Sequence, residues 1–92
     1  MIYEWDEAKA AQNVEKHGVP FEYAARVFLD PRRLDAEDTR RAYGEQRRLT
    51  LGHIEGRVYA VAYTVRGTVM RLISARKANE REQRRYHEAL PT

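Results

Sequence analysis

The chain contains no cysteine, so it can form neither a disulfide nor a thiolate metal site. It has no uninterrupted apolar run near the roughly 20 residues that a membrane-spanning helix needs. Its first residues, Met1 to Asp6, lack the basic segment and apolar core that are typical of a signal peptide. These absences predict a cytoplasmic protein in a reducing compartment, with no membrane partner.

Motifs of several enzyme classes are also missing. No GxSxG turn surrounds Ser74, and neither a Walker loop nor a GxGxxG motif is present. The three histidines, His17, His53 and His87, lie in separate segments without an HExxH motif or a carboxylate cluster. The sequence therefore predicts no metal site and no cofactor.

Size and charge narrow the class of protein. The 92 residues are enough for one domain, spanning residues 1–92, with one core. Net charge is uneven, at −3 for residues 1–31 and +6 for residues 32–92, and 14 of the 17 basic residues are arginine. Arginine binds phosphate through a planar, bidentate fork. This composition favours a nucleic-acid partner over a solvated surface on which Glu and Asp pair with the arginines.

Helix signals are clear at three places. Asp6 and Asn79 are good N-caps, Gly18 is a good C-terminal cap, and Pro20 blocks continuation. Glu82 stands at the capping-box position after Asn79. The sequence predicts helices over residues 7–17, 21–29 and 80–90.

The remaining segments show the alternation of residue types that is typical of β-strands. They are expected over residues 2–5, 33–38, 47–54, 57–65 and 68–76. Two-residue turns at Glu55-Gly56 and Arg66-Gly67 would join the last three strands as hairpins. The predicted fold class is α+β, with a three- or four-stranded antiparallel sheet.

The two turns assign strand residues to two faces. One predicted face is apolar and rich in alanine, with Arg47 and Arg71 toward its margins, and it carries Leu49, Leu51, Val58, Ala60, Ala62, Val69, Ile73 and Ala75. The other mixes hydroxyl, aromatic and guanidinium groups, from Arg48, Thr50, Arg57, Tyr59, Val61, Tyr63, Met70, Leu72, Ser74 and Arg76. We expect the N-terminal helices to cover the first face and RNA to meet the second.

This inventory suits RNA cleavage without a metal ion. The 2′-hydroxyl of RNA is a nucleophile already in place, so an enzyme must orient it, remove its proton and neutralise the phosphorane. Arg66, Arg71 and Arg76 are the candidates for the phosphate, and Glu45 and His17 for proton transfer. A structural ion pair of Glu45 and a helix-capping role of His17 remain alternatives.

A second group of residues is expected to bind RNA around that centre. Its members are basic or aromatic side chains on or near the predicted sheet, namely Arg47, Arg48, Lys77, Tyr63 and Tyr86. Packing in the last helix is the alternative role of Tyr86.

Several motifs together resemble a known family. YEWDExK at residues 3–9, KHGV at residues 16–19 and RxISARKA at residues 71–78 are similar to the BrnT toxins of bacterial type II toxin–antitoxin systems. Glu82 and Tyr86 continue the likeness, whereas residues 31–43 contribute no signal.

The resemblance implies a RelE-like fold, which is a twisted antiparallel sheet with two N-terminal helices on one face. It implies a ribonuclease that arrests translation and is neutralised by a BrnA antitoxin with a ribbon-helix-helix domain. Toxin and antitoxin would form a heterotetramer that binds operator DNA through the antitoxin. A non-catalytic corepressor and a nucleic-acid-binding module without chemistry remain alternatives.

Overall fold

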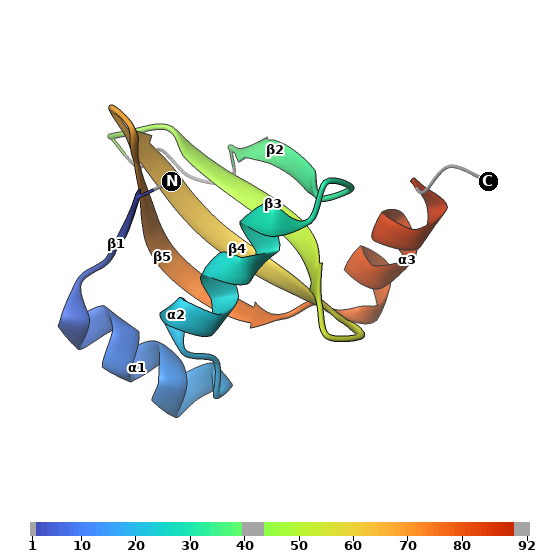
Figure 1. Cartoon of the computed structure of the whole chain (residues 1–92), viewed down its shortest axis with the longest axis horizontal. Coiled ribbons are helices and arrows are strands. Elements are labelled where there is room, and N and C mark those ends of the chain that lie inside the picture. Colours follow the sequence, from blue (N-terminus) through green and yellow to red (C-terminus); the bar gives the residue numbers. More distant parts are fainter. Residues whose placement is uncertain (1, 40–43, 90–92) are drawn as a thin grey trace.

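The computed structural model describes residues 2–39 and 44–89. These residues form a five-stranded sheet in the order β1-β5-β4-β3-β2, flanked by helices (Figure 1). The α+β class is confirmed. The elements are β1 (Ile2–Glu4), α1 (Glu7–His17), α2 (Phe21–Ala24), the 3₁₀ segment η1 (Ala25–Leu29), β2 (Leu34–Asp38), β3 (Arg47–Ile54), β4 (Arg57–Arg66), β5 (Val69–Lys77) and α3 (Glu80–Glu88).

The helix ends follow the predicted caps. The Asp6 side chain accepts a hydrogen bond from the backbone N–H of Lys9 at 3.0 Å, and Gly18 closes α1 with a left-handed φ of 72°. Asn79 and Glu82 form the reciprocal capping box of α3. The predicted end of this helix, Leu90, lies outside the described residues.

The predicted helix over residues 21–29 is divided into two segments. Its first turn, α2, is α-helical, and the rest, η1, tightens into a 3₁₀ helix. Phe21, Val27 and Phe28 are buried along it, so both segments contribute to the core although the helix type changes.

The first hairpin turn forms as predicted. Ile54 pairs with Arg57, and the two residues between them, Glu55 and Gly56, have φ values of 47° and 87°. Two successive positive φ values match the right-handed twist of the flanking strands.

The second turn lies one residue later than predicted. Arg66 still belongs to β4 and pairs with Val69, so the turn consists of Gly67 and Thr68. Gly67 supplies the positive φ, at 62°. This change moves the register of β5 by two residues, and therefore leaves the assignment of faces near the turn intact.

A β-bulge then reverses the faces of the last part of β5. Tyr63 pairs with Leu72, but its neighbour Ala62 pairs with Ser74, so Ile73 is an extra residue. A single extra residue turns every later side chain to the opposite face. The sequence did not reveal this bulge.

Because of the bulge, the predicted faces of three residues are wrong. Ser74 and Arg76 lie on the face of Ala62 and Ala60, whereas Ala75 lies on the other face, opposite Val61. Arg71, which precedes the bulge, keeps its predicted face.

The prediction of a wholly antiparallel sheet of three or four strands is wrong. β1 is a fifth strand and runs parallel to β5, with Ile2 opposite Val69 and Glu4 opposite Arg71. The chain leaves β1 directly into α1, so no hairpin joins β1 to β5, and parallel pairing is possible because a long connection separates the two strands.

The prediction of which face the N-terminal helices cover is also wrong. α2 and η1 pack on the face that carries Tyr59, Val61, Tyr63, Leu72 and Ala75, which we call the α2 face. These larger side chains fill the space beneath the helices, and the ring of Phe28 lies edge-on to Tyr63 with centroids 4.9 Å apart. This packing forms the main core.

Close approach between η1 and the sheet depends on Gly52 of β3. A Cβ atom at this position would lie 2.7 Å from the Cβ of Val27. A glycine is needed here for space and not for a special backbone angle.

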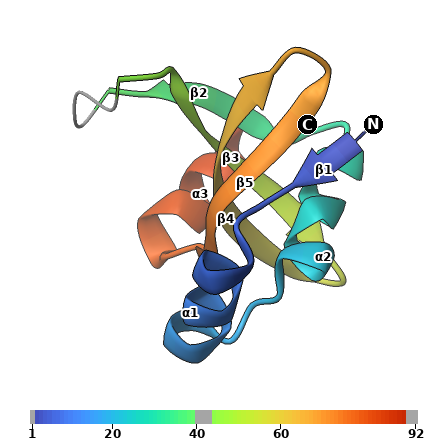
Figure 2. The same cartoon turned by 90° about the vertical axis from the view of Figure 1, so that its left-hand side faces the viewer.

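The opposite face, the α3 face, is covered only in part. It carries Leu51, Val58 and Ala60, against which Ala78 and Tyr86 of the C-terminal segment pack. Figure 2 shows α2 and α3 on opposite sides of the sheet. α3 lies at one end of the sheet (Figure 1).

Candidate functional site

The face expected to meet RNA is instead the core. Tyr63 is only 3% exposed, and its hydroxyl donates a hydrogen bond to Asp35. Arg48 binds the other oxygen of Asp35 through Nε at 2.5 Å. Burial acts to raise the pKa of Asp35, but the hydrogen bonds from Tyr63 and Arg48 outweigh it, so the pKa is lowered. In this arrangement Tyr63 presents no ring to a base.

Asn13 fixes α1 against the exposed edge of β5. Its side-chain nitrogen donates to the carbonyl oxygens of Val19 and Ala75, both at 2.9 Å, and its oxygen accepts the N–H of Ala75 at 3.1 Å. All polar atoms of this buried amide are therefore engaged. Residues on the same side of α1 are thereby held beside β5.

A basic cavity, the α1 cavity, opens where α1 meets the α3 face. It measures about 260 Å³ and is lined by Lys9, Gln12, Asn13, Lys16, His17, Arg47, Ile73 and Ser74. Two ammonium groups, one guanidinium and one imidazole thus line one small space together with a hydroxyl. Such a set can bind a phosphate and transfer protons.

Arg71 lies on the same face of the sheet but does not line this cavity. It stands opposite Thr64 on the α3 face, and its Nη1 is 3.2 Å from Glu4 of β1. Its charge also reaches the start of α1: the pKa of Asp6 is lowered mainly by the backbone N–H of Lys9 and to a smaller extent by Arg71. Arg71 therefore adds positive charge at the β1 side of the site.

Arg76 lies farther along the α3 face and is bound by α3. Its two terminal nitrogens donate to the two carboxylate oxygens of Glu82 at 2.7 and 3.0 Å. This bidentate contact lowers the pKa of Glu82. Glu82 thus links the capping box of α3 to the sheet.

Glu45 and Arg66 lie together, away from the α1 cavity. They form an ion pair at 3.4 Å, between the start of β3 and the end of β4, and neither lines the cavity. Lys77, at the end of β5, is exposed and stands opposite Tyr59, on the α2 side of the sheet. The structure therefore divides the predicted residues between several places.

Tyr86 is part of the packing of α3. It is 4% exposed, and its hydroxyl donates to Asp30 at 2.6 Å. Burial and this hydrogen bond raise the pKa of Tyr86 to about 12. His53 stacks on the same ring, with centroids 6.4 Å apart.

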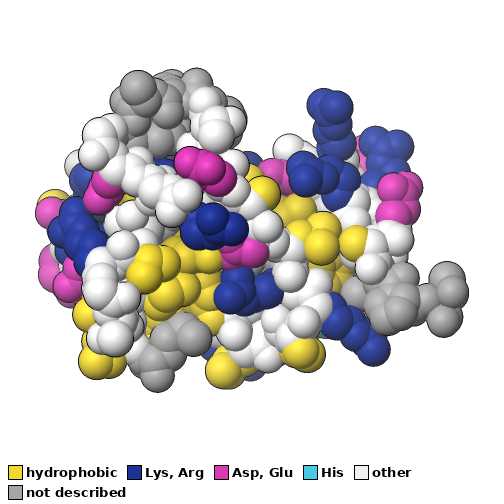
Figure 3. All heavy atoms as spheres, turned by 90° about the horizontal axis from the view of Figure 1, so that it is seen from above, with side chains coloured by type: hydrophobic (Ala, Val, Ile, Leu, Met, Phe, Trp, Pro, Cys, Tyr) yellow, Lys and Arg dark blue, Asp and Glu magenta, His cyan; other side chains and the backbone are white. Residues whose placement is uncertain are grey.

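Acidic groups are interleaved with the arginines over much of the surface. In the view of Figure 3, Asp and Glu side chains separate many of the basic ones, and hydrophobic side chains gather in between. Lys and Arg are densest at the end where α3 lies. On the face seen in this view, acidic and basic side chains therefore alternate and do not form one continuous basic surface.

The described residues form neither a metal-binding cluster nor a membrane-spanning helix. Among residues 2–39 and 44–89 there is no cluster of three or more His, Asp or Glu that could hold a metal ion. Within the same ranges no helix is both long and apolar enough to cross a membrane.

Six lining residues of the α1 cavity were not among the predicted site residues, namely Lys9, Gln12, Asn13, Lys16, Ile73 and Ser74. Lys9, Gln12 and Lys16 are spaced along one side of α1, and Ser74 reaches the cavity only because of the bulge. Lys9, Lys16 and Ser74 fall within the motifs quoted above, which were the available signal.

The fold and the site define a class: a small α+β protein with a basic cavity on a half-open sheet face. Residues 5–82 match the family model described as the ribonuclease toxin, BrnT, of a type II toxin–antitoxin system, and the chain belongs to this family. A search of curated proteins gave no match.

Proposed function

We propose that this chain is an endoribonuclease toxin that cleaves RNA without a metal ion and thereby arrests translation in the cytoplasm. The observation that carries the proposal is the α1 cavity, in which His17, Arg47 and two lysines line one space. The membership of a ribonuclease toxin family supports it. The two N-terminal helices and the twisted sheet are compatible with a RelE-like scaffold.

The reaction follows from the groups in the cavity. The 2′-oxygen of a ribose attacks the adjacent phosphorus while the bond from phosphorus to the 5′-oxygen breaks, which leaves a 2′,3′-cyclic phosphate and a 5′-hydroxyl. His17 accepts the proton of the 2′-hydroxyl, and an ammonium group of Lys9 or Lys16 donates one to the leaving oxygen. Arg47 stabilises the charge on the phosphorane.

Arg71 and Arg76 extend the basic character along β5. They stand on the same face, five positions apart, which corresponds to roughly 16 Å of strand. They therefore contact different phosphates of one RNA strand. We assign Arg71 to the scissile phosphate and Arg76 to another phosphate of the strand.

The partner we propose is a BrnA-like antitoxin with a ribbon-helix-helix domain, in a heterotetramer that binds operator DNA through the antitoxin. The family is one half of a two-component system, and a basic cavity open to solvent can be blocked sterically and electrostatically by a bound protein.

Cleavage of RNA by the purified chain in EDTA tests the proposal. We expect His17→Gln and Arg71→Ala each to lower the cleavage rate by about 10²- to 10³-fold, because each removes a group that acts on the transition state. Arg71→Lys should recover little, since an ammonium cannot bind phosphate bidentately.

The matched control is Arg57→Ala, which removes an exposed arginine from the start of β4. It should cleave as the parent does. Folded variants at His17 and Arg71 that cleave as fast as the parent would overturn the mechanism.

One set of contacts favours a second function, that of a non-catalytic corepressor. Arg48, Arg66, Arg71 and Arg76 are each held by a carboxylate of the chain itself. Absence of cleavage by the parent chain, together with antitoxin-dependent binding of operator DNA, would identify this function.

A further inference from the structure

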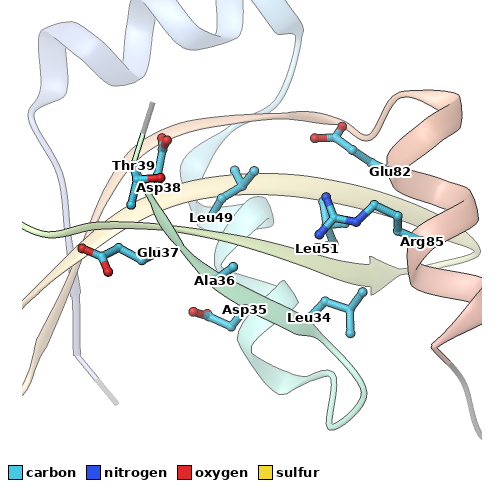
Figure 4. A pocket seen from close by; sticks show the side chains of 10 residues that line it. All are labelled: Leu34, Asp35, Ala36, Glu37, Asp38, Thr39, Leu49, Leu51, Glu82 and Arg85. Atoms are coloured by element: carbon cyan, nitrogen blue, oxygen red, sulfur yellow. The ribbon is translucent and has the colours of Figure 1, made fainter. Parts of the chain in front are cut away.

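A second, larger hollow lies on the α3 face, between β2 and α3. We call it the β2–α3 groove; it has a volume of about 540 Å³ and is shown in Figure 4. Its floor is aliphatic, formed by Leu34, Ala36, Leu49 and Leu51. Leu34 and Leu49 are only partly buried by the cluster beneath them, so the groove exposes apolar surface to solvent.

The α3 wall of the groove carries a positive charge. Arg85 extends from α3 toward the strands (Figure 4), whereas Glu37, which pairs with Arg48, lies on the opposite face of β2. Glu82 also lines the α3 wall, but Arg76 neutralises its carboxylate.

These surroundings fit a peptide better than RNA. None of the described residues that line the groove is aromatic, so they provide no platform on which a base could stack. An aliphatic floor beside a charged wall is typical of a groove that binds an amphipathic segment.

The groove lies on the same face of the sheet as the α1 cavity. Leu49 of its floor pairs with Ala62, which pairs with Ser74 of the cavity, so two strand spacings, about 10 Å, separate the two sites. Arg47, which lines the cavity, stands two residues before Leu49 in β3. A chain seated in the groove therefore lies next to the proposed path of the RNA.

We propose that the β2–α3 groove is the docking site of an amphipathic segment of the antitoxin. The segment inserts aliphatic side chains between Ala36 and Leu51, and it places an acidic group toward Arg85. The inference rests on the proposed function as a toxin of a type II system, and it assigns a surface and a chemistry to the partner.

The test fills the groove without disturbing the core. Ala36 is exposed on the groove floor, so Ala36→Arg adds a bulky charged side chain there. Titration calorimetry measures the affinity of the full-length variant for the antitoxin that the neighbouring gene encodes. We expect it to fall by about tenfold or more, whereas RNA cleavage by the antitoxin-free variant should stay within about threefold of the parent.

The matched control is Ala11→Arg, which places the same side chain on an exposed position of α1 that does not line the cavity. It should bind the antitoxin as the parent does. Arg85→Glu tests the charge of the α3 wall, and it should weaken binding in a way that depends on salt concentration.

Unchanged antitoxin affinity of both Ala36→Arg and Arg85→Glu would overturn the inference. Loss of RNA binding by Ala36→Arg with unchanged antitoxin affinity would also overturn it, because the groove would then be an RNA channel. A parent chain that cleaves no RNA but whose antitoxin binding depends on Ala36 would refute the proposed enzyme activity and leave the docking site supported.

Discussion

The two faces of the sheet use similar residue types for different purposes. On the α2 face, Tyr63 and Arg48 are joined to Asp35 beneath the N-terminal helices. On the α3 face, Arg47 lines a cavity with His17 and the lysines of α1. Arg47 and Arg48 are consecutive in β3 and point to opposite sides. Residue type alone therefore does not reveal function here, because the layer that covers each face decides it.

The largest expected effect is a loss in the free energy of unfolding when a side chain on the α2 face is shortened. Phe28→Ala removes a ring that packs on Tyr3 and Tyr63, and it should lower the free energy of unfolding by about 3–5 kcal/mol. Leu49→Ala on the half-open α3 face should lower it by only about 1–2 kcal/mol. Urea denaturation measures both, and equal losses would contradict the view that the α2 face holds the main core.

The next comparison uses the two consecutive arginines. Arg47→Ala should lower the rate of RNA cleavage by about 10²- to 10³-fold, because the charge that faces the phosphate is lost. Arg48→Ala should leave the rate of the folded enzyme within about threefold, since its partner is Asp35 on the covered face. Single-turnover cleavage of a short RNA measures both rates. The reverse order would place the active site on the α2 face.

A smaller effect is expected where the helical layer touches the sheet. Gly52→Ala introduces a Cβ within 2.7 Å of the Val27 side chain, so η1 must shift outward. We expect a loss of about 1–3 kcal/mol in the free energy of unfolding. The control is Thr68→Ala at the exposed hairpin turn. Gly44→Ala would not serve, because Gly44 has a positive φ. A Gly52→Ala variant as stable as the parent would show that η1 is not held against β3.

The smallest effect concerns the attachment of α3 and its dependence on pH. Tyr86→Phe removes the hydrogen bond to Asp30 and should reduce stability by about 1.5 kcal/mol at neutral pH. Because the folded state raises the pKa of Tyr86 from 10.0 to about 12, the stabilisation is complete below pH 10 and is lost as the pH rises toward 12.

The difference between the parent and Tyr86→Phe should therefore shrink between pH 10 and 12, as measured by urea denaturation at several pH values. A constant difference would show that the Tyr86 hydroxyl is not held by Asp30. RNA cleavage at neutral pH should be the same in both proteins, which separates a packing role of Tyr86 from an RNA-binding role.

Local signals of the sequence were sufficient for the helix ends and for the first hairpin. Asp6, Gly18 and Asn79 act through hydrogen bonds and backbone angles within a few residues of themselves, so their effect can be inferred without the rest of the chain. The motifs at residues 3–9, 16–19 and 71–78 likewise indicated the family that the family model confirms.

The tertiary structure alone decided which face is buried and which residues meet. Ile73 is an ordinary strand residue by its local sequence, yet the bulge there moves Ser74 and Arg76 to the α3 face. That bulge is set by pairing with β4, which is a contact between strands and not a property of the β5 sequence. The docking of α1 through Asn13 then brings Lys9, Lys16 and His17 to Arg47, which is 30 residues beyond His17 in the chain. The motifs thus indicated the family, and packing between distant segments determined which side chains lie together.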